Sequence, residues 1–366
     1  MKICMYNVTV AIKIGGIETY YWEVSRELKS LGHEVDIVTG NGSNIKYNDI
    51  KLSQFDFTPR EKIFNLGNRF RKWGERISFF KNSYSYLKEQ KYNVFLVHKP
   101  LDFFVCYFIK RISPKTKTIF VSGGEDFYGF DKYFSKYIDF MFAVSNDNAK
   151  KIKKRYKRDV KIIPNGVDIN KFKPNETDKK NLRDKYSLQN KKILLSVGRI
   201  VGWKGFQLII KSLIELKDFH YILIGDGEYI EELKKIAKEL KLEKRVLFLG
   251  MIDNQELPKY LNIADIFVQP SIGHEAFGIT IIEAMACGLP IVASRNGGIV
   301  DILKSSNSGY MFEINNTKQM ITYIKNTYKE KDKFSNNSSQ YVKDNFTWKL
   351  CVSKLLNKVK EIKNDS

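Results

Sequence analysis

Two carboxylates eight residues apart mark the segment of the chain with the clearest chemistry. Glu275 follows a short apolar run, and Glu283 lies in the stretch ITIIEAMA that begins after a glycine. A strand, a turn and a helix start in that order put Glu275 in a loop and Glu283 about one turn inside a helix. The backbone N–H groups of Phe277, Gly278 and Ile279 then lie at the helix N-terminus, which is a binding site for phosphate.

Two cations follow another apolar run. Arg199 and Lys204 are five residues apart in SVGRIVGWKGF, directly after KILLSV. Two positive side chains beside a helix N-terminus suit a diphosphate leaving group, which gains negative charge as its bond to a sugar breaks. This arrangement needs no metal ion. Taken alone, the segment would be interpreted more readily as ordinary surface cations.

These residues need a scaffold, and the remaining sequence predicts one. Short runs rich in Ile, Val and Phe alternate with amphipathic stretches of helix length, which is typical of parallel strands joined by crossover helices. We expect an α/β protein with two doubly wound, Rossmann-like domains of six strands each, and ligands outside the carboxyl ends of the strands. The expected strands begin near Lys2, Glu34, Asn93, Lys117, Phe140 and Val160 in the first half, and near Lys192, Tyr221, Val246, Asp265, Pro290 and Gly309 in the second.

The length of 366 residues also favours two domains. We expect the first to span residues 1–164 and the second residues 165–344. The polar stretch 173–191 has no strand pattern and is interpreted as a linker, and residues 332–340 as a loop rich in Ser and Asn. Residues 345–366 have apolar side chains at helical spacing, so this tail should pack one face on a core.

Charge and composition limit the classes of function. The chain has 62 Lys and Arg against 41 Asp and Glu, a net charge of +21, so part of its surface attracts polyanions. No helix-turn-helix, RNP or zinc signature is present, and we expect no nucleic-acid partner. Four cysteines without C-x-x-C spacing, and no apolar run of about 20 residues, predict a cytoplasmic protein.

The stretch 60–91 is basic and rich in aromatic side chains. Arg69, Arg71, Lys72, Trp73 and Arg76 lie in its first half. Such a helix can lie in a membrane interface, with cations on anionic headgroups and aromatic rings among acyl chains, which would place the protein at the inner face of the membrane. It can equally pack its apolar stripe on the first domain. Both interpretations stay open.

Five motifs together resemble one family. They are GGIETY from Gly15, IPNGVD from Ile163, VGRIVGWKGF from Val197, LIGDGE from Leu223, and HEAFGITIIEAMACGLPIVAS from His274. In this order and spacing they resemble the family 4 glycosyltransferases with the GT-B fold. The resemblance implies a first domain that binds acceptor, a second that binds a nucleotide-sugar donor, and a C-terminal helix that returns to the first domain.

The resemblance also implies roles for single residues. Arg199 and Lys204 would bind the donor diphosphate, Glu283 the nucleotide ribose, and Glu275 the sugar hydroxyls near the reacting carbon. The amides of residues 277–279 would contact sugar and phosphates.

Two further pairs have implied positions in the site. Gly15 and Gly16 would form a tight loop of the first domain that faces the diphosphate. The backbone near Met251 and Ile252 would contact the base.

One position departs from the family pattern. Many relatives have a histidine after the fourth strand of the first domain, and Ser122 stands there in TIFVSGGEDF. Glu125 and Asp126, or the backbone, could make the missing contact. His98 after the preceding strand is another substitute, although a lone histidine at a strand end is more often structural. Asp126 could instead face the acceptor.

The resemblance implies a retaining glycosyltransferase, and we expect it to need neither cofactor nor metal. It would move a sugar from a UDP- or GDP-sugar to a hydroxyl of a glycan or lipid-linked acceptor, in envelope polysaccharide or glycolipid synthesis. Two alternatives remain: a nucleotide-sugar-binding protein with little transfer activity, and a nucleotide-sugar 2-epimerase of the same fold.

Overall fold

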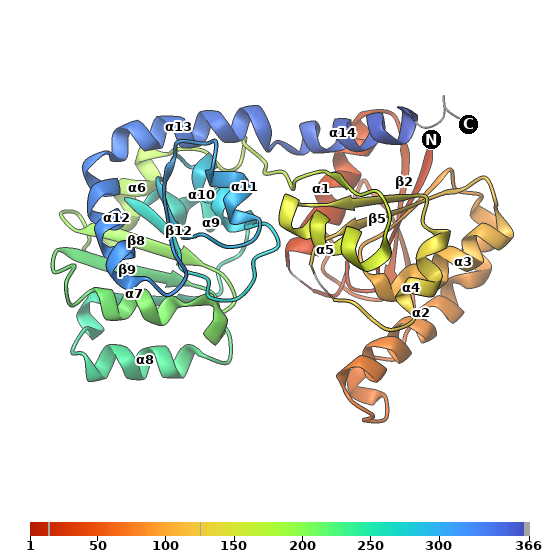
Figure 1. Ribbon diagram of the computed structural model, residues 1–366, viewed down its shortest axis with the longest axis horizontal. Coiled ribbons are helices and arrows are strands. Elements are labelled where there is room, and N and C mark those ends of the chain that lie inside the picture. Colours follow the sequence, from red (N-terminus) through yellow and green to blue (C-terminus); the bar gives the residue numbers. More distant parts are fainter. Residues whose placement is uncertain (14, 125, 362–366) are drawn as a thin grey trace. The chain divides into compact units, whose positions relative to one another are not determined.

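The computed structural model describes residues 1–13, 15–124 and 126–361, which form two compact units. Unit 1 comprises residues 1–165 and 348–366, and unit 2 comprises residues 166–347. The sequence predicted that the first domain ends at residue 164 and that the C-terminal tail begins at residue 345. Each unit has a wholly parallel sheet flanked by helices, so the expected α/β architecture is confirmed (Figure 1).

The sheet of unit 1 has seven strands in the order β3-β2-β1-β4-β5-β6-β7. One more strand is present than the sequence predicted, because the chain 51–55 forms an edge strand on β2. The strands are β1 (Lys2–Tyr6), β2 (Glu34–Gly40), β3 (Lys51–Phe55), β4 (Val94–Val97), β5 (Lys117–Ser122), β6 (Phe140–Ala143) and β7 (Lys161–Ile162).

Strand alternation divides the core of unit 1 into two layers. In β1, Ile3 and Met5 face one layer while Cys4 and Tyr6 face the other. The first layer packs on helices α1 (Gly16–Ser30) and α14 (Trp348–Glu361), so the C-terminal helix packs on unit 1. The second packs on α2 (Asn68–Gln90), α3 (Phe103–Ile112) and α5 (Asn146–Tyr156); the short α4 (Asp131–Phe134) contacts α3.

The sheet of unit 2 has six strands in the order β10-β9-β8-β11-β12-β13. They agree with the six expected from the sequence. The strands are β8 (Lys192–Val197), β9 (Phe219–Ile224), β10 (Val246–Gly250), β11 (Ile266–Gln269), β12 (Ile291–Ser294) and β13 (Gly309–Phe312).

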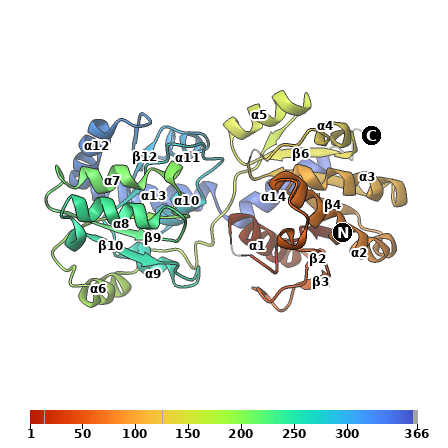
Figure 2. The same ribbon diagram turned by 90° about the horizontal axis from the view of Figure 1, so that it is seen from below.

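Helices cover both faces of this second sheet (Figures 1 and 2). One core layer joins α7 (Phe206–Ser212), α8 (Ile230–Glu239) and α12 (Thr317–Lys329) to the strands. On the other side, α6 (Glu176–Lys185) packs on α9 (Leu257–Asn262), and α10 (Ile279–Ala286) packs on α13 (Lys331–Asn345). The helix α11 (Ile299–Leu303) contacts β13.

Two expectations about irregular segments were wrong. The stretch 173–191 is not a linker, because it contains α6, whose Arg183 binds Asp265 at 3.0 Å and so anchors the helix in unit 2. Residues 332–340 are not a loop, because they belong to α13, which buries Phe334, Ser338 and Val342 at intervals of four residues.

Candidate active site

The strand order of unit 2 reverses between β8 and β11. Arg199 and Lys204 follow β8, and Glu275 follows β11. Parallel α/β sheets bind ligands outside the carboxyl ends of their strands at such a reversal. The structure therefore brings these three predicted residues to the edge of the sheet where a ligand is expected.

The carboxylate of Glu275 is buried and held from several sides. Its Oε1 accepts hydrogen bonds from the Ser271 hydroxyl at 2.7 Å and the Gln269 amide at 3.1 Å. The Lys204 ammonium also donates to this oxygen. The side chain is thus fixed before any ligand binds, which is what electrostatic preorganisation requires. Sequence reasoning missed Gln269 and Ser271, because only their contacts with the carboxylate identify them.

The backbone of the Glu275 loop is clamped by the loop after β12. The Asn296 side-chain amide donates to Ser271 O at 3.1 Å, and the Gly298 amide donates to Glu275 O at 2.8 Å. Gly297 has a positive φ of 49°, and a Cβ there would lie 2.0 Å from Glu275 O. No larger residue fits without displacing the loop that holds the carboxylate.

The loop that bears Lys204 is locked to the same segment. Trp203 O accepts hydrogen bonds from the amides of Ile272 and Gly273, at 2.8 and 3.0 Å. Gly205 has a φ of 75°, and a Cβ on it would lie 2.0 Å from Pro270 O. The ammonium and the carboxylate therefore belong to one rigid assembly of two loops.

The predicted helix start is confirmed, because α10 begins at Ile279. Gly278 precedes it with a φ of 110°, and Phe277 is buried against Phe346 with 5.8 Å between ring centroids. The first amides of an α-helix have no acceptor four residues earlier within the helix, and such amides can donate to an anion. In α10 the Ile281 amide already donates to Gly278 O at 3.0 Å. Glu283 is buried within α10.

The Arg199 loop is fixed by close backbone contact with the LIGDGE motif. A Cβ on Gly225 would lie 1.9 Å from Gly198 O, and one on Gly227 would lie 2.2 Å from Ile200 O. The Arg199 side chain itself is exposed. The close contacts at these glycines explain why the LIGDGE motif, a weak signal by itself, accompanies Arg199 in the sequence.

Met251 and Ile252 follow β10 at the same edge of the sheet. Met251 is exposed and Ile252 is half-buried. Their contact with a base stays a prediction.

In unit 1 the strand order reverses between β1 and β4. Gly15 and Gly16 lie beyond β1, where Gly15 caps α1 in an extended conformation and Gly16 is its first residue. A Cβ on Gly15 would lie 2.8 Å from the Glu18 carboxylate. The two glycines therefore stand at the switch point of their own sheet.

His98 follows β4 and is buried between aromatic rings. Its ring centroid lies 4.4 Å from that of Tyr20 and 5.2 Å from that of Tyr21. Burial, and then the nearby Lys99, lower the His98 pKa to about 3, so the imidazole is neutral at pH 7. Its substitution for the missing family histidine stays a prediction.

The other candidates after β5 have different surroundings. Ser122 is buried, and its hydroxyl donates to Gly124 O at 2.9 Å. Glu125 lies outside the described residues. Asp126 is partly exposed and pairs with Lys72 of α2 at 3.3 Å and with Lys99 at 4.0 Å.

The basic residues of α2 are not all available to a membrane, which corrects one expectation. Arg76 is buried in an ion pair with Asp102, and Lys72 is half-buried beside Asp126. Arg76 cannot present its charge to lipid headgroups without leaving Asp102. The apolar stripe of α2 packs Phe79 and Leu87 on the core, as the second interpretation predicted.

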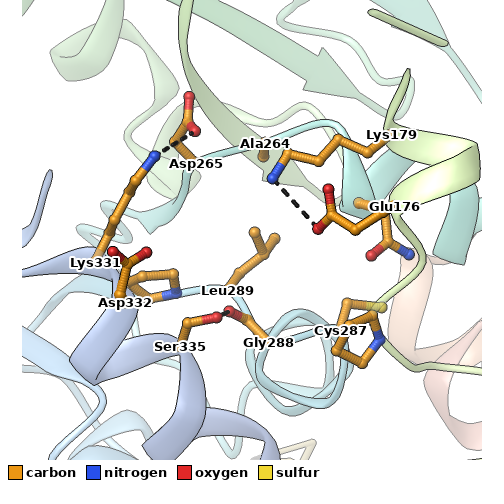
Figure 3. A pocket seen from close by; sticks show the side chains of 13 residues that line it. Glu176, Lys179, Ala264, Asp265, Cys287, Gly288, Leu289, Lys331, Asp332 and Ser335 are labelled. Carbon is orange, nitrogen blue, oxygen red and sulfur yellow. Dashed lines mark hydrogen bonds and ion pairs between the residues drawn. The ribbon is translucent and has the colours of Figure 1, made fainter. Parts of the chain in front are cut away.

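A polar pocket in unit 2 lies away from these residues (Figure 3). It is bordered by Asp265 and Pro290, which directly precede β11 and β12, and by side chains of α6 and α13. Ion pairs of 3.6 Å join Glu176 to Lys179 and Asp265 to Lys331. The pocket is therefore at the amino ends of these strands, opposite the edge that bears Glu275.

Comparison with known proteins identifies the family. Residues 14–171 match the glycosyltransferase family 4 domain, and residues 178–345 match the glycosyl transferases group 1 domain. An uncharacterized glycosyltransferase of Methanocaldococcus jannaschii is 27% identical, with 93% of each chain covered. A GDP-mannose-dependent phosphatidylinositol monomannoside mannosyltransferase of Mycolicibacterium smegmatis is 30% identical over 44% of this chain and 45% of its own.

Among solved structures, the Anabaena protein HepE in complex with UDP and glucose has a TM-score of 0.82 at 19% identity, covering 99% of this chain and 100% of its own. The expected α/β fold with two sheet domains is thus the observed one. The chain belongs to the group 1 glycosyltransferases of family 4 and has the GT-B fold.

Proposed function

We propose that this glycosyltransferase transfers a sugar, with retention, from a UDP- or GDP-sugar to a hydroxyl of a glycan or lipid-linked acceptor. It needs no metal ion or other cofactor, and it acts in envelope polysaccharide or glycolipid synthesis. The observation that carries the proposal is the fixed pairing of Lys204 with Glu275 beside the N-terminus of α10.

The groups of unit 2 suit the departure of a nucleoside diphosphate. Lys204, Arg199 and the first turn of α10 would neutralise the charge that develops on the diphosphate as the bond from the anomeric carbon to phosphate oxygen breaks. Glu275 would orient the sugar and stabilise positive charge at that carbon. Glu283 would bind the ribose.

Retention requires the acceptor oxygen to bond on the face that the diphosphate leaves. In this route the departing phosphate oxygen takes the proton of the acceptor hydroxyl, so the enzyme supplies no nucleophile. Glycosidases that retain configuration instead use a carboxylate nucleophile and a second carboxyl group as acid and base. Glu275 is therefore assigned to positioning and charge stabilisation.

The relatives support the classes of donor and acceptor. HepE is described with UDP and glucose, and the mycobacterial relative by its name uses GDP-mannose and a mannosylated phosphatidylinositol. Both are consistent with a nucleotide-sugar donor, and the second with a lipid-linked acceptor.

We further propose that unit 1 associates with the cytoplasmic face of an anionic membrane through the start of α2. There, Phe64 and Leu66 are 77% and 64% exposed, and α2 extends beyond the rest of unit 1 (Figure 1). The tip patch consists of Phe64, Leu66, Phe70 and Trp73 with Arg69 and Arg71. Among the described residues, no helix is long and apolar enough to cross a bilayer.

Turnover tests the proposed reaction. The purified chain is incubated with UDP-glucose, UDP-galactose, GDP-mannose or ADP-glucose, with EDTA or with Mg²⁺, and nucleotide release is measured. We expect release from UDP- or GDP-sugars that EDTA does not abolish. If the chain binds these nucleotide-sugars but releases nucleotide from none of them, it is a binding protein. If nucleotide release requires Mg²⁺, the metal-independent reaction is contradicted.

Sedimentation with vesicles tests the membrane proposal separately. Phe70→Ser with Trp73→Ser should reduce binding to phosphatidylglycerol vesicles. Ile214→Ser removes a comparably exposed apolar side chain from unit 2 and should not. Equal sedimentation of all variants would show that the tip patch does not bind lipid.

A further inference from the structure

Three segments of unit 1 bring charged side chains together beyond the carboxyl ends of β4 and β5. Arg69, Lys72 and Arg76 lie on one face of α2, at spacings of three and four residues. Lys99 follows β4 after one residue, and Asp126 follows β5. Because these strands are neighbours beside the switch point of the sheet, the cations lie at the edge where unit 1 would present an acceptor.

The contacts within this group are specific. Asp126 Oδ2 pairs with Lys72 at 3.3 Å and with Lys99 at 4.0 Å, and its Oδ1 accepts a hydrogen bond from the Tyr128 hydroxyl at 3.1 Å. The Arg69 guanidinium lies 5.9 Å from the centre of the Tyr128 ring. We call Arg69, Lys72 and Lys99 the cation cluster.

The charges in this region do not balance. Arg76 and Asp102 are both buried and neutralise each other. Among the described residues, Lys72 and Lys99 then share the carboxylate of Asp126, and Arg69 lies against the ring of Tyr128, which donates to the same carboxylate. Burial and the neighbouring Arg76 lower the pKa of Lys99, which shows that nearby negative charge only partly offsets its desolvation. An additional anion would relieve this cost.

We propose that the acceptor bears a phosphate group and that Lys72, Lys99 and Arg69 bind it. This inference rests on the proposed function, since it names a property of the acceptor in the transfer reaction. Among the described residues of this group, the cations of the cluster outnumber the Asp126 carboxylate, and this positive excess suits a phosphate better than a neutral glycan. Asp126 holds the two lysines in place and leaves their remaining N–H groups for the ligand.

Thermal shift with inorganic phosphate tests the site. The donor site is first filled with a saturating nucleoside diphosphate, or impaired by Lys204→Ala if none binds. Phosphate should then raise the Tm of the wild-type chain, and the midpoint of that rise should move to roughly tenfold higher phosphate in Lys99→Gln and Lys72→Gln. Lys115→Gln removes an exposed lysine of the same unit and should behave as wild type.

Two sources of the phosphate are distinguished by a second arm. Competition is measured between inorganic phosphate and vesicles of phosphatidylglycerol in phosphatidylcholine. If vesicles displace phosphate in the wild type but not in Lys99→Gln, the cluster binds a lipid headgroup. If they do not displace it, the phosphate belongs to a soluble or saccharide-linked group.

The failures of the two proposals can be told apart. If all variants respond to phosphate equally, the phosphate site is wrong while nucleotide binding and release still stand. If no nucleotide binds but Lys99→Gln loses the phosphate response, the proposed transfer is in doubt and the site remains. Lys99→Arg separates charge from packing, because it keeps the positive charge while changing the shape of the side chain. A phosphate response retained in Lys99→Arg and lost in Lys99→Gln would show that the charge is what matters.

Discussion

The two sheets present different kinds of chemistry at their carboxyl edges. In unit 2, glycines allow loops to touch backbone to backbone, and these contacts fix Glu275 and Lys204 in one assembly. In unit 1, charged side chains from α2 and from the segments after β4 and β5 meet around Asp126. The proposed donor site is therefore held mainly by backbone contacts, whereas the cation cluster is held by contacts between side chains.

The largest effect should follow loss of the Glu275 charge. Glu275→Gln keeps the size of the side chain but removes the carboxylate that Lys204, Ser271 and Gln269 hold. We expect kcat for nucleotide release to fall roughly 1,000-fold, because a preorganised charge in a buried site is lost. Glu232→Gln, an exposed position on α8, is the matched control. Near-normal turnover of Glu275→Gln would remove it from the mechanism.

A smaller effect is expected on nucleotide affinity. Lys204→Ala should weaken nucleoside diphosphate binding roughly 100-fold by calorimetry, since it deletes a charge-assisted contact and leaves Glu275 buried without its cation. Arg199→Ala should cost less, because that side chain is exposed. If Lys115→Gln in unit 1 weakened nucleotide binding as much as Lys204→Ala, the effect would be one of overall charge.

Low pH should destabilise unit 1 more than unit 2. In the folded chain the pKa of His98 is about 3, below its ordinary value of 6.5. As the pH falls, the unfolded chain therefore takes up a proton on this imidazole before the folded chain does. Stability is therefore present above pH 6.5 and is lost as pH falls toward 3, by about 2 kcal/mol between pH 6.5 and 5.

Hydrogen exchange should show unit 1 opening before unit 2 at pH 5, and His98→Phe should remove that difference. His220→Phe in unit 2 is the control, because His220 is less buried and its pKa is also lowered by burial. Equal acid sensitivity of the two units would contradict the assignment of a buried neutral His98.

Local patterns predicted most of this architecture but failed where burial is slight. Eleven of the twelve expected strands are well formed, and β7 shrinks to two residues. The edge strand β3 was missed because its side chains are mostly half-buried, and α6 because it buries none. In α13, the serine at position 338 occupies a core position and hides the helical period.

The same distinction applies to the candidate site. Glu275, Lys204 and the α10 start could be predicted because the chemistry lies within short motifs. The spacing of Arg69, Lys72 and Arg76 does predict one helix face, but what that face meets depends on Asp102 and Asp126, distant in sequence. Long-range pairing of this kind leaves no local signal, so the sequence could not decide between a membrane surface and packing on the first domain for the basic stretch.

The most direct test of the central claim, a donor site built by unit 2, is calorimetric titration with UDP, GDP and ADP, first with EDTA and then with Mg²⁺. The account predicts that UDP or GDP binds selectively without metal and that Lys204→Ala weakens this binding. Absence of binding by every nucleotide, or binding only with Mg²⁺, would contradict it.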